Sequence, residues 1–355
     1  MKEKTLNIRN YIAKIPLIQG GMGVGVSLGG LAGAVAECGA VGIISTAQIG
    51  FREKTFRSNP LKANLLAMQK EFEKARSLAR EGIIGFNIMV ATRNYKEYIK
   101  KAVELKAPLI ISGAGLPMDL PEYTKGTDTC IAPIVSSAKA AKLILKYWDR
   151  KFGETADLVV IEGPMAGGHL GFKYEQLEQL DAITYEQEIL KIAEVVREYE
   201  KQYERKIPIV FAGGIHDKKQ VRHVFSLGLD GVQVASRFVT TKECDASDAY
   251  KDAYLHARKE DITIIKSPVG MPGRAVRNEF VKRLEKGETK AVTQCYQCLS
   301  HCNPKEIPYC ITEALIRAVS GDIKEGLIFC GGYSYMSKKI ESVKEVIDSL
   351  MNLDV

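Results

Sequence analysis

The chain has 355 residues, a formal net charge of +7 and a hydrophobic content of 46%, which suits one large globular unit. Charges of both signs are mixed and no block of five or more like charges occurs, so we expect no nucleic-acid partner. The first ten residues have no apolar segment and the apolar runs are only strand-length, so we expect no secretory signal and no membrane span. A cytoplasmic location, with reduced cysteines, is the default expectation.

Short apolar runs recur along the first two thirds of the chain, each ending in glycine or a small polar residue. Such runs are typical of parallel strands that are buried on both faces. There are eight of them: Pro16–Gly20, Val41–Thr46, Ile84–Val90, Leu109–Gly115, Ile131–Ser137, Leu158–Gly163, Ile207–Gly214 and Gly231–Phe238.

Amphipathic stretches alternate with these runs and indicate helices. Examples are Leu61–Arg80, Tyr95–Lys106, Ser137–Trp148, Glu186–Lys201 and Asp217–Leu227. Eight strand–helix units favour an α/β fold of the (β/α)₈ TIM-barrel type. A doubly wound open sheet with additional strands is the alternative.

The alternation of apolar strand-like runs and amphipathic stretches ends after Phe238. Residues 245–290 are charged, and we predict helices there, with a Pro- and Gly-rich turn at residues 267–273; a last helix is predicted at Lys338–Met351. No Gly/Ser/Pro-rich linker precedes this part. We therefore expect a barrel over residues 1–245 and a C-terminal extension, residues 246–355, packed on it.

Glycine-rich segments follow several strands, at the end of a barrel where active sites form. Residues 20–25 read GGMGVG, which lets backbone amides approach a ligand but does not match the dinucleotide-binding fingerprint. Residues 212–215 (AGGI) and 235–238 (ASRF) follow the seventh and eighth strands, the usual phosphate site of such barrels. The Ser236 hydroxyl could donate to a phosphate, and Arg237 could pair with it or be a structural surface charge.

Polar candidates follow the sixth and third strands. His169 lies in the segment EGPMAGGHLG, residues 162–171, and imidazole is suited to proton transfer near neutral pH. Glu162 could hold a ribityl hydroxyl, and Asn87 could face the polar edge of a flavin ring. The structural alternatives are a buried hydrogen-bonded carboxylate and a strand-end cap.

Four cysteines lie close together in the extension: Cys295, Cys298, Cys302 and Cys310. Four thiols in this spacing could bind zinc or an iron–sulfur cluster, with His301 as a further ligand. The alternative is a reduced loop whose cysteines only pack. Cys38, Cys130, Cys244 and Cys330 are interpreted as isolated core or surface residues.

Together, the segments at residues 16–22, 85–87, 162–171, 212–215 and 230–238 resemble the nitronate monooxygenase (2-nitropropane dioxygenase) family, over roughly residues 15–240. Related motifs occur in flavin-type enoyl-acyl-carrier-protein reductases. The resemblance implies FMN as the cofactor and His169 as the catalytic residue that faces the substrate. The cofactor contacts it implies are Gly21, Met22, Asn87, Glu162, Gly167, Gly168, Ala212, Gly213, Gly214, Gln233, Ala235 and Ser236.

The resemblance leaves the reaction open. Oxidation of nitronates with oxygen is our first hypothesis; an NAD(P)H-dependent enoyl or ene reductase, with or without an iron–sulfur cluster, is the second. A regulatory flavin- or phospholigand-binding barrel without catalysis is the third, and an intact His169 argues against it. Met165 stands where the family usually has an acid. We expect a small-molecule substrate, and we consider a homodimer as the assembly.

Overall fold

A closed barrel of eight parallel strands forms the centre of the computed structural model, which describes residues 4–180 and 184–352. Residues 1–3 of the predicted barrel unit and residues 353–355 of the predicted extension therefore lie outside the described residues. Around the barrel the strands follow the order β10-β11-β3-β4-β5-β6-β7-β8. Their bounds are β3 Leu17–Gln19, β4 Val41–Ser45, β5 Ile83–Met89, β6 Leu109–Gly113, β7 Cys130–Val135, β8 Val159–Glu162, β10 Ile209–Ala212 and β11 Gly231–Val234. The predicted TIM barrel is confirmed.

The barrel strands are buried on both faces, which is why they read as unbroken apolar runs. All five residues of β4 are buried, for example. An antiparallel hairpin of β1 (Leu6–Ile8) and β2 (Tyr11–Ala13) contributes to the core inside the barrel. Leu6 and Ile8 of the hairpin are at most 1% exposed, so the hairpin covers one end of the barrel and leaves the other end for the loops that follow the strands.

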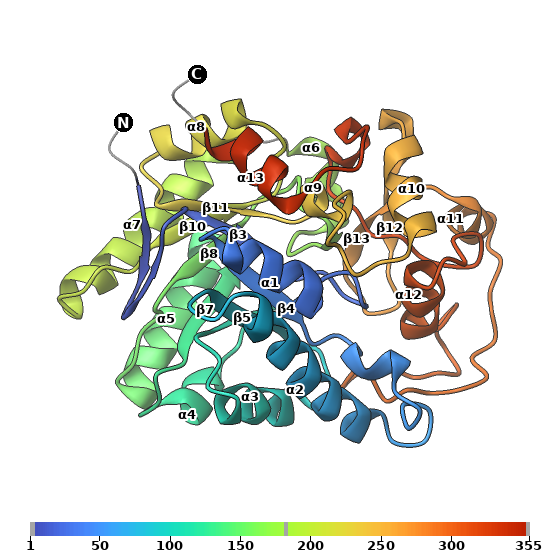
Figure 1. Ribbon diagram of the computed structural model, residues 1–355, viewed down its shortest axis with the longest axis horizontal. Coiled ribbons are helices and arrows are strands. Elements are labelled where there is room, and N and C mark those ends of the chain that lie inside the picture. Colours follow the sequence, from blue (N-terminus) through green and yellow to red (C-terminus); the bar gives the residue numbers. More distant parts are fainter. Residues whose placement is uncertain (1–3, 181–183, 353–355) are drawn as a thin grey trace.

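Helices surround the strands (Figure 1). Sequence signals set their starts: the side chains of Asn59, Ser137 and Asp217 cap α2, α5 and α8 by accepting backbone N–H bonds. The helices in this part are α1 Gly29–Glu37, α2 Pro60–Leu78, α3 Tyr95–Glu104, α4 Leu120–Thr124, α5 Ala138–Phe152, α6 Tyr174–Gln179, α7 Glu186–Gln202, α8 Lys218–Ser226 and α9 Ser236–Val239, with a 3-10 turn η1 at Ile49–Arg52. Each of the five helices named as examples in the sequence analysis is present, as α2, α3, α5, α7 and α8.

The C-terminal extension contains a small sheet that the sequence analysis did not predict. Strands β12 (Ile262–Lys266) and β13 (Pro272–Val276) form an antiparallel hairpin, and β13 also pairs with β9 (Gly168–His169) from the barrel. The prediction of helices throughout residues 245–290 is therefore wrong over these strands. The Ile and Thr residues of β12 favour extended backbone. Strand β13 is further stabilised by β9, which lies about a hundred residues earlier in the chain and could not be recognised as its partner from local sequence. The predicted turn at 267–273 connects the two strands.

The remaining elements of the extension are helical. They are α10 Asp248–His256, α11 Glu279–Glu285, α12 Ile311–Val319 and α13 Val343–Met351, with 3-10 turns η2 at Lys259–Asp261 and η3 at Ser334–Met336. The last helix starts later than predicted because Ser342 and Glu345 form a capping box at its beginning. Helix α13 packs against α1, α8 and α9 of the barrel.

Across the described part of the chain, no helix has both the length and the apolar composition needed to cross a membrane. The division at residues 245/246 and the homodimer stay predictions.

Candidate functional site

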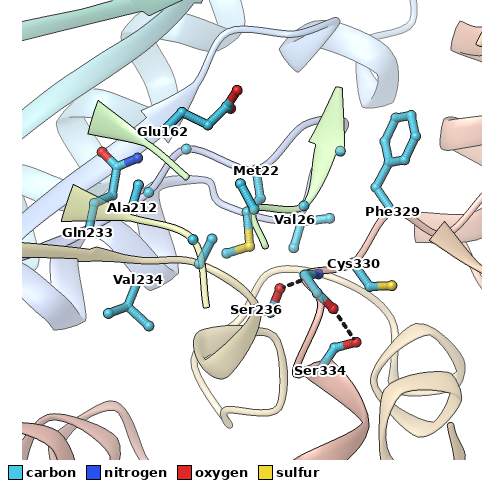
Figure 2. Close-up of a pocket in the computed structure, with 18 of the residues that line it drawn as sticks. Met22, Val26, Glu162, Ala212, Gln233, Val234, Ser236, Phe329, Cys330 and Ser334 are labelled. Carbon is cyan, nitrogen blue, oxygen red and sulfur yellow. Dashed lines mark hydrogen bonds between the residues drawn. The ribbon is translucent and has the colours of Figure 1, made fainter. Parts of the chain in front are cut away.

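A cavity of about 240 Å³ lies at the carboxyl ends of the barrel strands (Figure 2). Its walls come mainly from the segments that follow β3, β8, β10 and β11, the end of the barrel where this fold carries its sites. His169 lines it, as do all the residues predicted to contact the cofactor: Gly21, Met22, Asn87, Glu162, Gly167, Gly168, Ala212, Gly213, Gly214, Gln233, Ala235 and Ser236. The structure thus brings the predicted set together, while their individual roles stay predictions.

Glycines shape one side of the cavity. Gly213 and Gly214 have φ angles of +103° and +77°, a conformation that other residues rarely adopt. A Cβ atom on Gly213 would lie 2.8 Å from the backbone nitrogen of Ala166. Side chains at these positions would therefore strain the backbone and collide with the neighbouring loop.

Ser236 connects the loop after β11 to a segment of the extension. Its Oγ atom accepts a hydrogen bond of 2.8 Å from the backbone N–H of Gly331 (Figure 2). Residues 329–334 (FCGGYS) line the same cavity, and the sequence analysis did not assign them to the site. The double glycine Gly331-Gly332 was the signal that could have identified them. Cys330, interpreted as an isolated residue, is buried but also lines the cavity.

Arg237 is not the surface charge that was the structural alternative, because it is buried and pairs with Glu341. It is 9% exposed, and its Nη1 atom lies 2.5 Å from Oε2 of Glu341. Burial raises the pKa of Glu341, but the hydrogen bond and the charge of Arg237, followed by the charge of Lys339, lower it overall. Arg237 therefore ties the loop after β11 to the C-terminal segment.

Gln233 carries an unsatisfied polar atom at the wall of the cavity. Its Oε1 atom is buried and, within the described residues, has no hydrogen-bond partner. Buried polar atoms normally have partners, so an orphaned acceptor beside a cavity indicates a missing donor. Asn87 is also weakly engaged, since its side-chain amide makes a bond of 3.4 Å from Nδ2 to the carbonyl of Ile111. An orphaned acceptor, a weakly engaged amide and the glycine loops beside Ser236 fit the ring edge and phosphate of FMN.

Glu162 ends β8 and faces the cavity (Figure 2). Burial raises the pKa of this carboxyl to about 7, although a hydrogen bond from the Gly171 N–H and the charge of Arg274 both lower it. The backbone nitrogen of Gly171 lies 2.8 Å from Oε2 of Glu162. Glu162 can therefore be protonated near neutral pH, and it could then donate a hydrogen bond to a ligand hydroxyl as well as accept one.

His169 lies on β9, held by the extension. Its Nε2 atom is 2.8 Å from Oγ of Ser267, and its ring meets that of Phe329 edge-on, with centroids 4.9 Å apart. Burial lowers the pKa of His169 to about 4, so the imidazole is neutral at neutral pH. Among the described residues, Nδ1 has no hydrogen-bond partner. That nitrogen is available to a ligand.

Arg274 of β13 supports the loop that leads to His169. Its Nη1 atom donates to the carbonyl of Pro164 at 2.9 Å and also to the carbonyl of Ala166. Strand pairing adds a second tie, because Gly273 and Arg274 pair with His169 and Gly168. The extension thus fixes the catalytic-end loop of the barrel, a role that the sequence analysis did not assign to it.

Met165, which stands where the family usually has an acid, packs between two glycine segments. Its side chain lies beside Gly214 and Gly332, and its carbonyl accepts a 3.0 Å bond from the Gly332 N–H. A thioether therefore takes the place of a charge at this wall of the cavity. Met165 therefore makes this wall more apolar than an acid would. The backbone of the loop is held by Arg274, which donates to the carbonyls of Pro164 and Ala166.

The four clustered cysteines lie in the loop between α11 and α12. Burial raises the pKa of Cys298 to about 11, although a hydrogen bond with Thr312 lowers it, and the charges of Cys310 and Cys302 add to the rise. All four are free thiols. Within residues 4–180 and 184–352, no three His, Cys, Asp or Glu side chains are already arranged to hold a metal ion. The predicted metal site therefore stays a prediction.

Comparison with known proteins identifies the family to which the chain belongs. The nitronate monooxygenase family model matches residues 5–352. A probable nitronate monooxygenase of Staphylococcus aureus (strain JH9) is 24% identical over 233 residues, which are 63% of this chain and 58% of that relative's length. The match thus spans little more than half of the relative.

Two solved structures are similar over nearly the whole chain. FabK from Thermotoga maritima is 25% identical, with a TM-score of 0.72 over 96% of this chain and 92% of that one. Nitroalkane oxidase from Streptomyces ansochromogenes is 18% identical, with a TM-score of 0.72 over 96% of both chains, a likeness that shows the fold alone. The family match covers both the barrel and the extension that closes its site, and the chain belongs to the nitronate monooxygenase family.

Proposed function

We propose that this protein is an FMN-dependent oxidoreductase that oxidises alkyl nitronates with oxygen, as a nitronate monooxygenase. The observation that carries the proposal is a neutral imidazole, His169, at the wall of a cavity that also contains glycine loops and an orphaned amide oxygen. Membership of the nitronate monooxygenase family supports the same conclusion.

Three groups of residues at the cavity wall would each hold a different part of FMN. Gly213, Gly214 and Ser236 would hold the phosphate, and Glu162 would hold a ribityl hydroxyl. Gln233 and Asn87 would face the polar edge of the ring. Bound FMN would supply the two-electron redox chemistry, while the protein sets geometry and electrostatics.

His169 is better suited to binding an anion than to removing a proton. A histidine whose pKa is about 4 is a weak base at neutral pH. If the Ser267 hydroxyl donates to Nε2, the proton of the neutral ring lies on Nδ1, the nitrogen without a partner among the described residues. Nδ1 would then donate to a nitronate oxygen. The proposal therefore favours nitronates, which are already ionised, over neutral nitroalkanes.

A second candidate is an NAD(P)H-dependent enoyl or ene reductase. The observation that favours it is the apolar part of the cavity wall, which includes Met89, Ile134, Leu315 and Phe329. These side chains suit an acyl chain, and Nδ1 of His169 could donate to the carbonyl of an enoyl substrate. In this reaction NADH or NADPH would be the source of electrons.

Anaerobic spectra of the FMN-loaded protein separate the two candidates. The flavin absorbance is recorded after NADH, after NADPH and after an alkyl nitronate. Bleaching by the nitronate alone supports the monooxygenase, and steady-state kcat/KM should then be higher for the nitronate than for its parent nitroalkane. Bleaching by a nicotinamide, with no response to nitronate, would reject the first proposal in favour of the reductase.

A further inference from the structure

His216 is a second histidine at the wall of the cavity, and the sequence analysis gave it no role. It lies in the loop after β10, between Gly214 and Asp217, the residue that caps α8. Its backbone N–H donates to Oε1 of Gln220 at 2.6 Å, whereas its ring forms no hydrogen bond with any described residue. The backbone is therefore fixed, and the imidazole is available to a ligand.

Strand pairing brings His216 beside the loop that carries Ser236. Strands β10 and β11 are parallel neighbours, and Ala212 pairs with Gln233 in their register. The segments that follow these two residues therefore leave the barrel side by side, and they contain His216 and Ser236. Both residues line the cavity, as does Gly214. The imidazole thus lies at the end of the cavity where we place the phosphate.

This end of the cavity has little positive charge with which to balance a phosphate. Among the described residues that line the cavity, Arg237 alone carries a permanent positive charge, and it is already paired with Glu341. The Nε atom of Arg237 is buried and has no hydrogen-bond partner in the described part of the chain, which indicates a missing acceptor nearby. A phosphate monoester carries a charge of about −1.5 to −2 at pH 7, so one paired guanidinium does not balance it.

The surroundings of His216 make its charge depend on an anion. Burial is the main cause that lowers its pKa, and the charge of Arg237 lowers it further, while the charges of Asp217 and Glu341 raise it. These groups face it from α9, from its own loop and from the C-terminal segment. A phosphate beside the ring would favour the protonated form. Binding of a phosphate would therefore be accompanied by uptake of a proton on His216.

We propose that His216 binds the phosphate of FMN and so increases the preference of the site for FMN over riboflavin, the same flavin without its phosphate. The inference rests on the proposed FMN site but not on the nitronate reaction. The protonated ring would donate a hydrogen bond to a phosphate oxygen, which riboflavin lacks. The contacts proposed for Asn87, Glu162 and Gln233 involve the ring and the ribityl chain, which the two flavins share.

Titration of the flavin-free full chain with FMN and with riboflavin tests this inference. The dissociation constants are measured from the change in flavin fluorescence. We expect His216→Gln to weaken FMN binding by about tenfold, the effect of one hydrogen bond to a charged group, and to leave riboflavin binding unchanged. The matched control is His223→Gln, because His223 is an exposed histidine of α8 that does not line the cavity. It should bind both flavins as the unchanged protein does.

The pH dependence gives a second readout, one that a purely structural histidine would not change. The difference in FMN preference between the unchanged protein and His216→Gln should be larger at pH 6 than at pH 8, because only the unchanged protein can take up the proton. The ionisation of FMN itself cancels in this comparison.

The titrations need no turnover, so they separate this inference from the proposed reaction. An equal preference for FMN in the two proteins, or an equal loss of affinity for both flavins in His216→Gln, would overturn the role of His216 and leave the FMN site standing. Equal affinity of the unchanged protein for FMN and riboflavin would reject that role together with the phosphate assignment of Gly213, Gly214 and Ser236.

Discussion

The Nε2 atom of His169 and the Oγ atom of Ser267 lie 2.8 Å apart, although the two residues belong to different parts of the chain. Ser267 stands at the turn between β12 and β13, and β13 pairs with the strand that carries His169. The hydroxyl can therefore set the orientation and the tautomer of the imidazole. Ser267 acts through His169 and is a positioning residue.

Replacing Ser267 with Ala should lower kcat by roughly tenfold, about the effect of one lost hydrogen bond. The free imidazole could then populate both tautomers, so the pH dependence of kcat should also change. Ser267→Thr keeps a hydroxyl and should restore most of the activity. Unchanged kcat and an unchanged pH profile in Ser267→Ala would show that the bond has no role in turnover.

Replacing His169 with Ala should leave FMN bound but lower kcat/KM by about one to two orders of magnitude, the effect of losing one hydrogen bond to a charged oxygen. The expected defect is kinetic because the residue is proposed to contact the substrate. Turnover and the FMN content per chain are measured on the same preparation. Loss of FMN without a specific kinetic defect would indicate a structural role for His169.

Replacing Ser236 with Asp should empty the FMN site. The new carboxylate would stand where we place the phosphate, and two negative charges repel strongly in a partly buried site. Ser236→Ala removes the hydroxyl without adding charge and should retain more FMN. Stoichiometric FMN in Ser236→Asp would refute the phosphate assignment.

Glu162 should make the cofactor-free protein less stable at alkaline pH. Its pKa is raised from 4.5 to about 7 in the folded state, so its contribution is present below the unfolded pKa and is lost as the pH rises through 7. His169, with its lowered pKa, acts oppositely and loses stability as the pH falls from 6.5 towards 4. Glu162→Gln removes only the first effect, so its urea midpoint at pH 8, relative to pH 5, should be higher than that of the unchanged protein. The same relative midpoint in both proteins would contradict the assignment.

The barrel could be predicted because its strands are local, apolar and repeated. Residues such as those of β4 are buried on both faces, and this pattern is visible without knowing their neighbours. The positions of Asn87, Glu162 and His169 followed from the same reasoning, since loops after barrel strands meet at one end. All three line the observed cavity.

The contributions of the extension could not be predicted in the same way. Ser267, Arg274 and Gly331 each bond to a residue of the barrel loops that lies about a hundred positions away in the chain. No local pattern encodes which distant segment a short strand or a buried arginine will meet. Arg237 illustrates the same limit, because its partner Glu341 lies in the last part of the chain.

Helix α13 occupies the space between α1 and α8 on the outside of the barrel, while β11 is followed only by the four-residue α9. Its buried residues Val343, Val346, Ile347 and Leu350 belong to the main core. During synthesis the amino-terminal part of a protein emerges and begins to fold first. This barrel, however, cannot cover the space between α1 and α8 until α13, which comes long after β11 in the chain, has left the ribosome. A nascent chain therefore keeps part of its core open to water until that helix packs.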